Sequence, residues 1–200
     1  VKPANYSWIN CEFAFNEGSS LYLRSFGNLI ENCYFHNSQF GPTVYGAVSD
    51  RKGGDTTLRR NTFHTLGVQN VSKNGPNGII EYNHSYNMLF HGDFSCYQVP
   101  AGSQSSTLLH HNWAHHCYGR NGVRFDGDPA GTGCKVHHIV SMGNARGFRL
   151  KGDNHQFYNL TSLLSHAKSD INIAHEKFYG YDKKGTSING RRGSVPNHGN

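Results

Sequence analysis

The sequence has few of the signals that build helices or cross membranes. No stretch longer than ten residues keeps the 3.6-residue apolar period of an amphipathic helix, and Asn, Gly, Ser, Tyr and Phe are abundant instead. The chain also lacks a run of 18 apolar residues, which a membrane-spanning helix needs. We therefore expect an all-β protein with no membrane span.

Two further absences limit the partners. No CxxC spacing of the kind that holds zinc occurs among the five cysteines, Cys11, Cys33, Cys96, Cys117 and Cys134. Lys and Arg exceed Asp and Glu by 19 to 13, which gives a net charge of +6, but no basic stripe interleaved with aromatic residues is present. We therefore expect no nucleic-acid partner.

A repeat organises the chain. Gly122–Asp128 reads GVRFDGD and returns 25 residues later as GFRLKGD at Gly147–Asp153. The apolar residues stand two apart, which is the period of a strand with one buried face, and each Gly-Asp marks a turn. A repeat of this length is typical of solenoids.

A second motif, apolar-x-polar-small-x-apolar, extends the repeat over most of the chain. It starts at Trp8, Ile30, Leu58, Ile80, Leu109, Val136 and Phe157, in steps of 22, 28, 22, 29, 27 and 21 residues. Three residues later stand Cys11, Cys33, Asn61, Asn83, Asn112, Ile139 and Leu160, and five residues later stand Phe13, Phe35, Phe63, Ser85, Ala114, Ser141 and Ser162. These columns predict side chains stacked in register, with a buried amide ladder at the Asn positions.

Coils of about 22 residues are too short to bury their own apolar stripe, so each must stack on its neighbours with strands roughly 4.8 Å apart. We predict a single-stranded parallel β-solenoid of about 7–8 coils. The longest steps predict loops that bulge out at Gly41–Thr57 and Asp93–Thr107.

The motifs LIENCYFHN, LRRNTFHT, IIEYNHSYN and LLHHNWAHH resemble the short repeats of the right-handed parallel β-helix superfamily, the pectate-lyase-like fold, across residues 7–175. Its members include polysaccharide lyases, glycoside hydrolases, uronate epimerases, phage tailspikes and non-catalytic surface proteins, so the fold does not choose the activity. Of the polygalacturonase pattern, only Arg149-Leu150-Lys151 echoes one element. An acidic polysaccharide is the polyanion that suits this fold best.

Residues 1–175 are expected to form the β-helix domain, and residues 176–200, which are basic and rich in Gly, an irregular tail or a last coil. The chain starts at Val1 with neither Met nor a signal peptide and leads straight into a coil. An end without a capping repeat exposes apolar edges. We therefore expect a segment of a longer chain or a processed product, with flanking coils or other copies stacked on the open ends.

Four Asn-x-Ser/Thr sequons are compatible with a secreted protein, at Asn5, Asn70, Asn83 and Asn159. We expect an extracellular or cell-surface location. Asn83 and Asn159 lie within the stacking motif, where burial would block glycosylation.

Cys11 and Cys33 occupy the same column of adjacent coils. A separation near 4.8 Å lies within the range that a disulfide tolerates. The two residues therefore either form a disulfide or stack as reduced thiols.

Arg124 and Arg149 should lie one above the other on the outer face, where like charges repel. Asp126 beside Lys151 offsets part of this repulsion. A uronate or sulfate group would relieve the rest, because guanidinium forks fit carboxylates. Arg124, Arg149 and Lys151 are therefore the candidate ligand-binding residues, and a solvated, internally neutralised patch is the alternative.

A catalytic role would use residues from the same region. In a lyase, Lys151, Arg149 or a His such as His91 would abstract the proton beside a uronate carboxylate. A hydrolase would need two carboxylates about 5 to 9.5 Å apart, for which Asp126 and Asp128 are the best pair.

The segment Met88–Asp93 aligns with the repeat. The alignment places His91, Asp126 and Lys151 in one column and Asp93, Asp128 and Asp153 in the next. The aspartates either cap turns through their side chains or hold Ca²⁺, which takes several oxygen ligands. Ca²⁺ is the cofactor that this row would suit.

His is abundant at 14 residues, and three adjacent pairs lie near one another in the stack: His110-His111, His115-His116 and His137-His138. A metal site needs convergence, and we expect the side chains of paired neighbours to diverge. We interpret these residues as substitutes for Asn in the polar positions of the repeat, titrating near pH 6.5.

Two functions stay open. A non-catalytic structural or adhesive module of a larger secreted or surface protein, in contact with acidic glycans, is favoured by the regular ladders and by the lack of a recognisable catalytic set. A polysaccharide lyase or glycoside hydrolase is the alternative.

Overall fold

The computed structural model describes residues 5–41, 46–50, 53–67, 72–73, 75–89, 95–100, 106–119, 121–126, 132–167 and 169–174. These residues form nineteen β-strands and no helix, which confirms the all-β prediction. His91, Asp93, Asp128 and the predicted tail at 176–200 lie outside them. Within the described part of the chain, no helix is long and apolar enough to cross a membrane.

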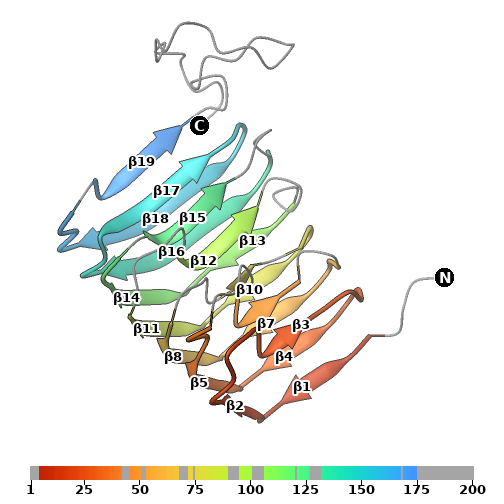
Figure 1. Cartoon of the computed structure of the whole chain (residues 1–200). Coiled ribbons are helices and arrows are strands. Elements are labelled where there is room, and N and C mark those ends of the chain that lie inside the picture. The colour runs from red at the N-terminus through yellow and green to blue at the C-terminus, as the bar shows by residue number, and fades with distance from the viewer. Residues whose placement is uncertain are drawn as a thin grey trace, which may run out of the picture.

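Two rows of short strands form the larger sheet (Figure 1). The first row contains β1 (Ser7–Ile9), β4 (Leu29–Glu31), β7 (Thr57–Arg59), β10 (Ile79–Glu81) and β13 (Leu108–His110). The second row contains β2 (Glu12–Ala14), β5 (Tyr34–Ser38), β8 (Thr62–Leu66), β11 (His84–Met88) and β14 (Trp113–Cys117). β16 (Lys135–Met142) spans both rows and joins them into a twelve-stranded sheet, and β18 (Gln156–Leu163) pairs with β16.

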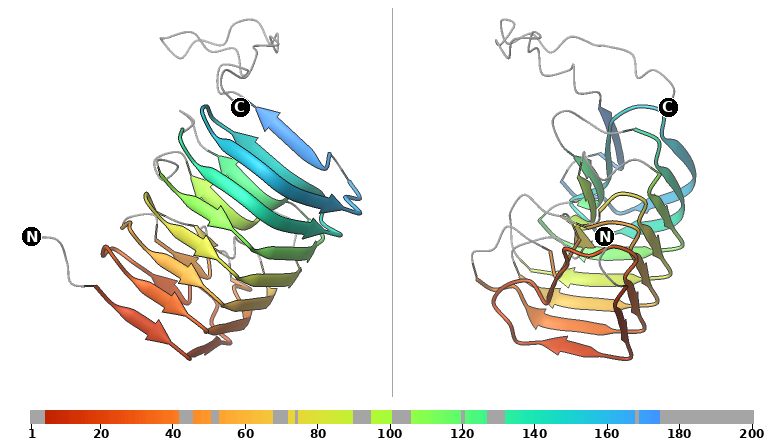
Figure 2. Two further views of the ribbon diagram at one scale, coloured as in Figure 1. Left: turned by 180° about the vertical axis from the view of Figure 1, so that it is seen from behind. Right: turned by 90° about the vertical axis from the view of Figure 1, so that its right-hand side faces the viewer.

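A seven-stranded sheet closes the coils on the other side. It contains β3 (Leu21–Tyr22), β6 (Val48–Ser49), β9 (Ser72–Lys73), β12 (Ser95–Pro100), β15 (Asn121–Asp126), β17 (Arg146–Lys151) and β19 (Ile171–Ala174). The first five coils contribute three separate strands each, and the last two contribute two each. The two views in Figure 2 show these coils stacked in successive layers. All neighbouring strands pair in parallel, for example β1 with β4 and β15 with β17, which confirms the predicted parallel β-solenoid.

The strand register confirms the predicted columns. The first column is paired step by step through Trp8, Ile30, Leu58, Ile80, Leu109, Val136 and Phe157. The column from Phe13 to Ser162 is paired in the same way. Inside the coils, the rings of Phe35 and Phe63 are fully buried and stack with centroids 4.7 Å apart. The apolar core therefore runs along the axis of the solenoid.

Single residues in the left-handed region form the corners on either side of the second row. The first corner has φ between 51° and 57° at Asn10, Asn32, Arg60, Tyr82, His111, His138 and Asn159. The second has φ between 47° and 61° at Phe15, Asn37, Thr65, Asn87, His116, Gly143 and Leu164. Asn and His adopt this backbone conformation more readily than most residues, which accounts for their frequency in both columns.

The predicted amide ladder is present. The Asn61 side-chain oxygen accepts from the Cys33 backbone N–H at 2.8 Å, and the Asn83 side-chain oxygen accepts from the Asn61 backbone N–H at 3.0 Å. Asn112 repeats the contact with the Asn83 backbone N–H at 2.9 Å. All three amides are almost fully buried. Because each side chain bonds the next coil, the ladder fixes the register between coils.

The two predicted loops are partly wrong, because each contains a strand of the seven-stranded sheet. β6 lies within Gly41–Thr57 and β12 lies within Asp93–Thr107. Within β12, Cys96, Tyr97 and Val99 are fully buried. The residues around these strands are rich in Gly and Ser, which are typical of loops, so the sequence did not reveal the strands.

Cys11 and Cys33 are reduced, as are the other three cysteines. The Cys33 thiol donates to the backbone oxygens of Trp8 and Glu31 at 3.4 and 3.3 Å. Burial raises the pKa of the Cys33 thiol. Of the two alternatives for this pair, the structure therefore shows stacked thiols.

The predicted burial of two sequons is half right. Asn83 is 2% exposed, which blocks glycosylation there. Asn159 is exposed because it occupies a corner with φ 53°. Its burial was therefore wrongly predicted.

Replacing Asn83 with Ala should lower the free energy of unfolding by about 3 kcal/mol or more. The change leaves the Asn61 backbone N–H without its side-chain acceptor and removes the bonds from the Asn83 amide to the Leu58 carbonyl oxygen and to Asn112, and a buried group that loses its partner costs about 1–3 kcal/mol. Urea unfolding measures the loss. Thr62→Ala, at an outward and partly exposed position beside Asn61, is the control and should cost less than about 1 kcal/mol. Equal losses in the two variants would contradict the ladder's role.

Asp50 is a buried carboxyl group beside β6. Burial raises the pKa of Asp50 to about 6, and Asp55 adds to the shift. Contacts with Thr56 and the Gly75 backbone lower the pKa but do not cancel the effect of burial. The folded chain thus binds this proton more tightly than the unfolded chain does. Asp50 therefore destabilises the fold once pH rises through the window between about 4 and 6.

The difference in unfolding free energy between Asp50→Asn and the wild type should depend on pH. The wild type should lose about 2 kcal/mol relative to the variant as pH rises from 4 to 7, because only the wild type must bury a charge. Urea titrations at several pH values measure the difference in unfolding free energy between the two proteins. The contributions of the other titrating groups cancel in this difference. Parallel stability curves for the two proteins would show that Asp50 has an ordinary pKa.

Candidate functional site

The predicted arginine pair is present. Arg124 on β15 lies beside Arg149 on β17, as predicted. Arg124 is 3% exposed and Lys151 is 4% exposed, so the prediction that Arg124 faces solvent is wrong. Asp126 accepts a hydrogen bond from the Arg124 guanidinium, and its other oxygen accepts one from Arg149 at 3.2 Å. One carboxylate thus contacts both guanidinium groups and offsets one of their two positive charges.

The predicted columns that contain His91 and Asp93 are wrong. β11 ends at Met88, which lies beside Cys117 of β14, and the strand next to β15 is β12. Pro100 therefore stands opposite Asp126, and Gln98 stands opposite Arg124. His91 is therefore not opposite Asp126, and His91 and Asp93 themselves lie outside the described residues.

Asp153 is half-buried, and its backbone forms an isolated β-bridge with Thr132. Asp93 and Asp128 lie outside the described residues. A Ca²⁺ site at Asp93, Asp128 and Asp153 stays a prediction.

Side-chain rings form a continuous strip on the outer face of four consecutive coils. We call this surface the ring strip, and it comprises Tyr34, His36, His64, His84, Tyr86, Trp113 and His115. Its strands, β5, β8, β11 and β14, lie one above another in Figure 1. The strip was missed in the sequence, although outward positions one and three residues after the Cys/Asn column would have located it.

The rings of the strip stack along the solenoid axis. His64 and Tyr86 have centroids 5.1 Å apart and planes inclined by 12°, and Tyr86 and His115 have centroids 5.2 Å apart and planes inclined by 7°. His84 stacks on Trp113 at 4.6 Å. The ring faces therefore cover one another, and the edges are left to meet solvent.

Three imidazoles of the ring strip have a lowered pKa. Burial lowers the pKa of His64 and of His84. Burial, together with His84 and His116, lowers the pKa of His115 to about 4. These three imidazoles therefore add no positive charge to the strip at neutral pH. The remaining imidazole, His36, contacts the Glu12 carboxylate at 2.7 Å.

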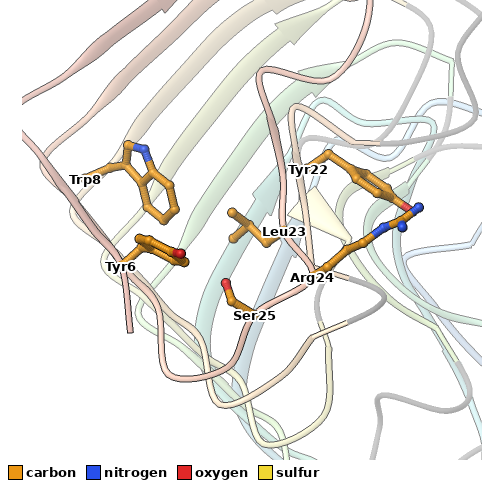
Figure 3. Close-up of a pocket in the computed structure, with 6 residues that line it drawn as sticks. All are labelled: Tyr6, Trp8, Tyr22, Leu23, Arg24 and Ser25. Atoms are coloured by element: carbon orange, nitrogen blue, oxygen red, sulfur yellow. The ribbon is translucent and has the colours of Figure 1, made fainter. Parts of the chain in front are cut away.

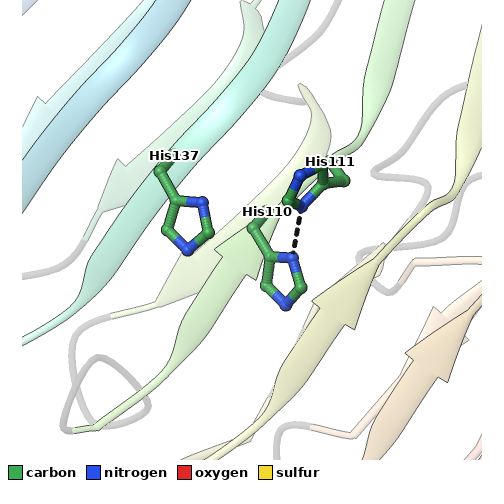
Figure 4. Close-up of side chains that lie close together, drawn as sticks. All are labelled: His110, His111 and His137. Atoms are coloured by element: carbon green, nitrogen blue, oxygen red, sulfur yellow. Dashed lines mark hydrogen bonds between the residues drawn. The ribbon is translucent and has the colours of Figure 1, made fainter.

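A second group of imidazoles lies at the first corner, between the first and the second row of strands. Figure 4 shows His110, His111 and His137 close together. The Nδ1 atoms of His110 and His111 are 2.7 Å apart, and those of His137 and His138 are 2.9 Å apart. The rings of His110 and His137 stack at 4.9 Å, and the rings of His111 and His138 stack at 4.7 Å. These four residues are the histidine block.

Paired histidines were predicted to diverge, and this prediction is wrong. His110 ends β13 in an extended conformation, whereas His111 has φ 51°. The left-handed corner turns the second side chain back toward the first, so that the two Nδ1 atoms meet. His137 and His138, where φ is 52°, repeat this geometry on the next coil.

A pocket of about 380 Å³ lies at the first coil, away from both imidazole groups. Tyr6 and Trp8 line one side and Leu23 and Ser25 lie between them and Tyr22 (Figure 3). Tyr6 and Trp8 have ring centroids 5.9 Å apart. The pocket marks one end of the apolar core and suits an apolar group.

The architecture defines this protein as a parallel β-solenoid. Residues 1–162 match the family described as "Right handed beta helix region", and the chain belongs to that family. No curated protein and no solved structure matches the chain. The family confirms the resemblance stated from the sequence motifs and indicates no activity.

Replacing Asp126 with Asn should lower the free energy of unfolding by about 2–4 kcal/mol, because it removes a carboxylate that contacts the buried Arg124 guanidinium. Thermal and urea unfolding measure the change. Arg60→Gln, which removes an exposed partner of Glu31, is the control and should have almost no effect. If both variants were as stable as the wild type, Asp126 would not be the internal counter-ion.

Proposed function

We propose that this chain is a non-catalytic module of an extracellular or cell-surface protein, a rigid rod that binds a glycan along the ring strip. The observation that carries the proposal is the unbroken row of rings over four consecutive coils. A regular solenoid supplies such a row because the same position recurs in every coil.

The chemistry of the ring edges supports a polar polymer as the ligand. Phenol oxygens and the indole N–H of the strip can donate or accept hydrogen bonds. The imidazole nitrogens of His64 and His115 contact neighbouring side chains and hold the strip together. Tyr34 is 38% exposed and Trp113 is 43% exposed, so both reach solvent. Rings that combine an apolar body with a polar edge suit sugars, which present both C–H and O–H groups.

The charge of the ring strip favours a neutral glycan at neutral pH. His64 and His84 carry no charge there, because burial lowers the pKa of each. The acidic-glycan site expected at Arg124, Arg149 and Lys151 has its two guanidinium groups paired with Asp126. An acidic polysaccharide at that place stays a prediction, and the strip is the better supported surface.

No observation on the described residues favours a lyase or hydrolase. Asp126, the carboxylate of the proposed hydrolase pair, is engaged by two guanidinium groups. Lys151, the proposed lyase base, is 4% exposed. Neither is placed to exchange a proton with a polysaccharide that arrives from solvent.

The end of the rod supplies a second contact surface. The pocket lined by Tyr6, Trp8 and Leu23 exposes part of the core column at the first coil. This surface suits a flanking coil or a second copy, whose apolar residues would continue the stack.

Trp113→Thr and Tyr34→Thr should each weaken glycan binding by about tenfold, which corresponds to 1.4 kcal/mol. Each change removes one exposed ring from the strip. Thr is native to the same column at Thr62 and Thr161, so the fold tolerates it. A glycan panel identifies the ligand, and calorimetry with that ligand measures the affinities.

The matched control is Tyr82→Asn. Tyr82 is 51% exposed but lies at the first corner, off the strip, in a column where Asn occurs naturally. This variant should bind like the wild type. Equal binding by Trp113→Thr and the wild type would overturn the proposal, and release of unsaturated or reducing-end products from the panel would support an enzyme instead.

A further inference from the structure

We propose that His110, His111 and His137 form a binding site for a divalent transition-metal ion such as Zn²⁺. One nitrogen from each of the three imidazoles lies within 4.8 Å of the other two. Imidazole nitrogen is the donor that Zn²⁺, Ni²⁺ and Cu²⁺ share.

The spacing is close to that of a metal centre. Zinc binds imidazole nitrogen at about 2.0–2.1 Å, so two nitrogens on a tetrahedral ion stand about 3.3 Å apart. The Nδ1 atoms of His110 and His111 are now 2.7 Å apart. A shift of less than about 1 Å would replace their hydrogen bond with two bonds to one ion.

Glu81 lies beside the first ligand. Its carboxylate is 3.2 Å from Nε2 of His110, across the ring from the Nδ1 atom that meets His111. A carboxylate on the far nitrogen is the usual support of a metal-binding histidine. The His110 side chain is only 12% exposed, which restricts its rotation.

His111 is exposed, so an ion can reach the site from solvent. The rings of His110 and His137 are nearly parallel, inclined by 14°, so one must turn about χ2 to direct its lone pair at the shared ion.

The second corner offers a natural comparison. His115 and His116 repeat the pair, with Nδ1 atoms 2.6 Å apart and φ 54° at His116. The next coil places Met142 beside His115, where the first corner has a third imidazole. Among the described residues, only the first corner gathers three metal-binding side chains.

Calorimetry with ZnCl₂ on the chelator-treated full chain tests the site. We expect one ion per chain for the wild type and a loss of about tenfold or more in affinity for His111→Asn and for His137→Gln. Asn is native to the corner column of His111, at Asn10, Asn32 and Asn159, so His111→Asn should keep the fold. Thermal unfolding confirms that each variant is folded.

His116→Asn is the matched control, because it makes the same change at the corner where no three imidazole nitrogens converge among the described residues. Asn37 and Asn87 occupy its column, and this variant should bind Zn²⁺ like the wild type. The visible spectrum of the Co²⁺ form should show tetrahedral bands in the wild type and lose them in His111→Asn. No saturable binding by the wild type, or equal affinities for wild type and His111→Asn, would overturn the proposal.

Discussion

The parallel, in-register pairing of each coil with the next is the constraint on which the rest of the structure depends. A strand in one coil satisfies its backbone groups only through the coils on either side, so a given position recurs at the same place in every layer. The apolar columns, the amide ladder, the ring strip and the histidine block are consequences of that pairing. The ladder from Asn61 to Asn112 also strengthens it, because a shift by one residue would break each amide contact.

Much of this could be predicted from the sequence, because a column with a constant chemical requirement leaves a periodic trace. Ile30, Leu58 and Ile80 recur at the motif's spacing and all point into the core. The seven-stranded sheet left a weaker trace: β6 has two residues and β12 lies among Gly and Ser, so both were assigned to loops. Local likeness was misleading at Met88–Asp93, since a resemblance over six residues does not fix the register, and Pro100 stands opposite Asp126 instead of His91.

The alternation of apolar and polar residues could not predict which outward side chains are buried. Period-two alternation separates inside from outside, but it does not tell which outside positions are covered. Arg124 points away from the core column of β15 and is still 3% exposed. The same limit hid the pairing of Asp126 with two guanidinium groups, because the sequence suggested Lys151 as its partner. Electrostatic arguments made from a repeat therefore need the side-chain contacts before they can support a binding site.

The corners of the solenoid are the places where metal-binding side chains from two columns can come together. Along one column, identical rings stack in parallel. Their lone pairs then point in the same direction and do not meet at one ion. Convergence requires a second column that faces the first, and a left-handed residue provides it by turning His111 back on His110. In the described chain, two successive coils carry His in both of these columns, at 110–111 and 137–138. That combination, and not the abundance of His, distinguishes a metal site from a structural stack.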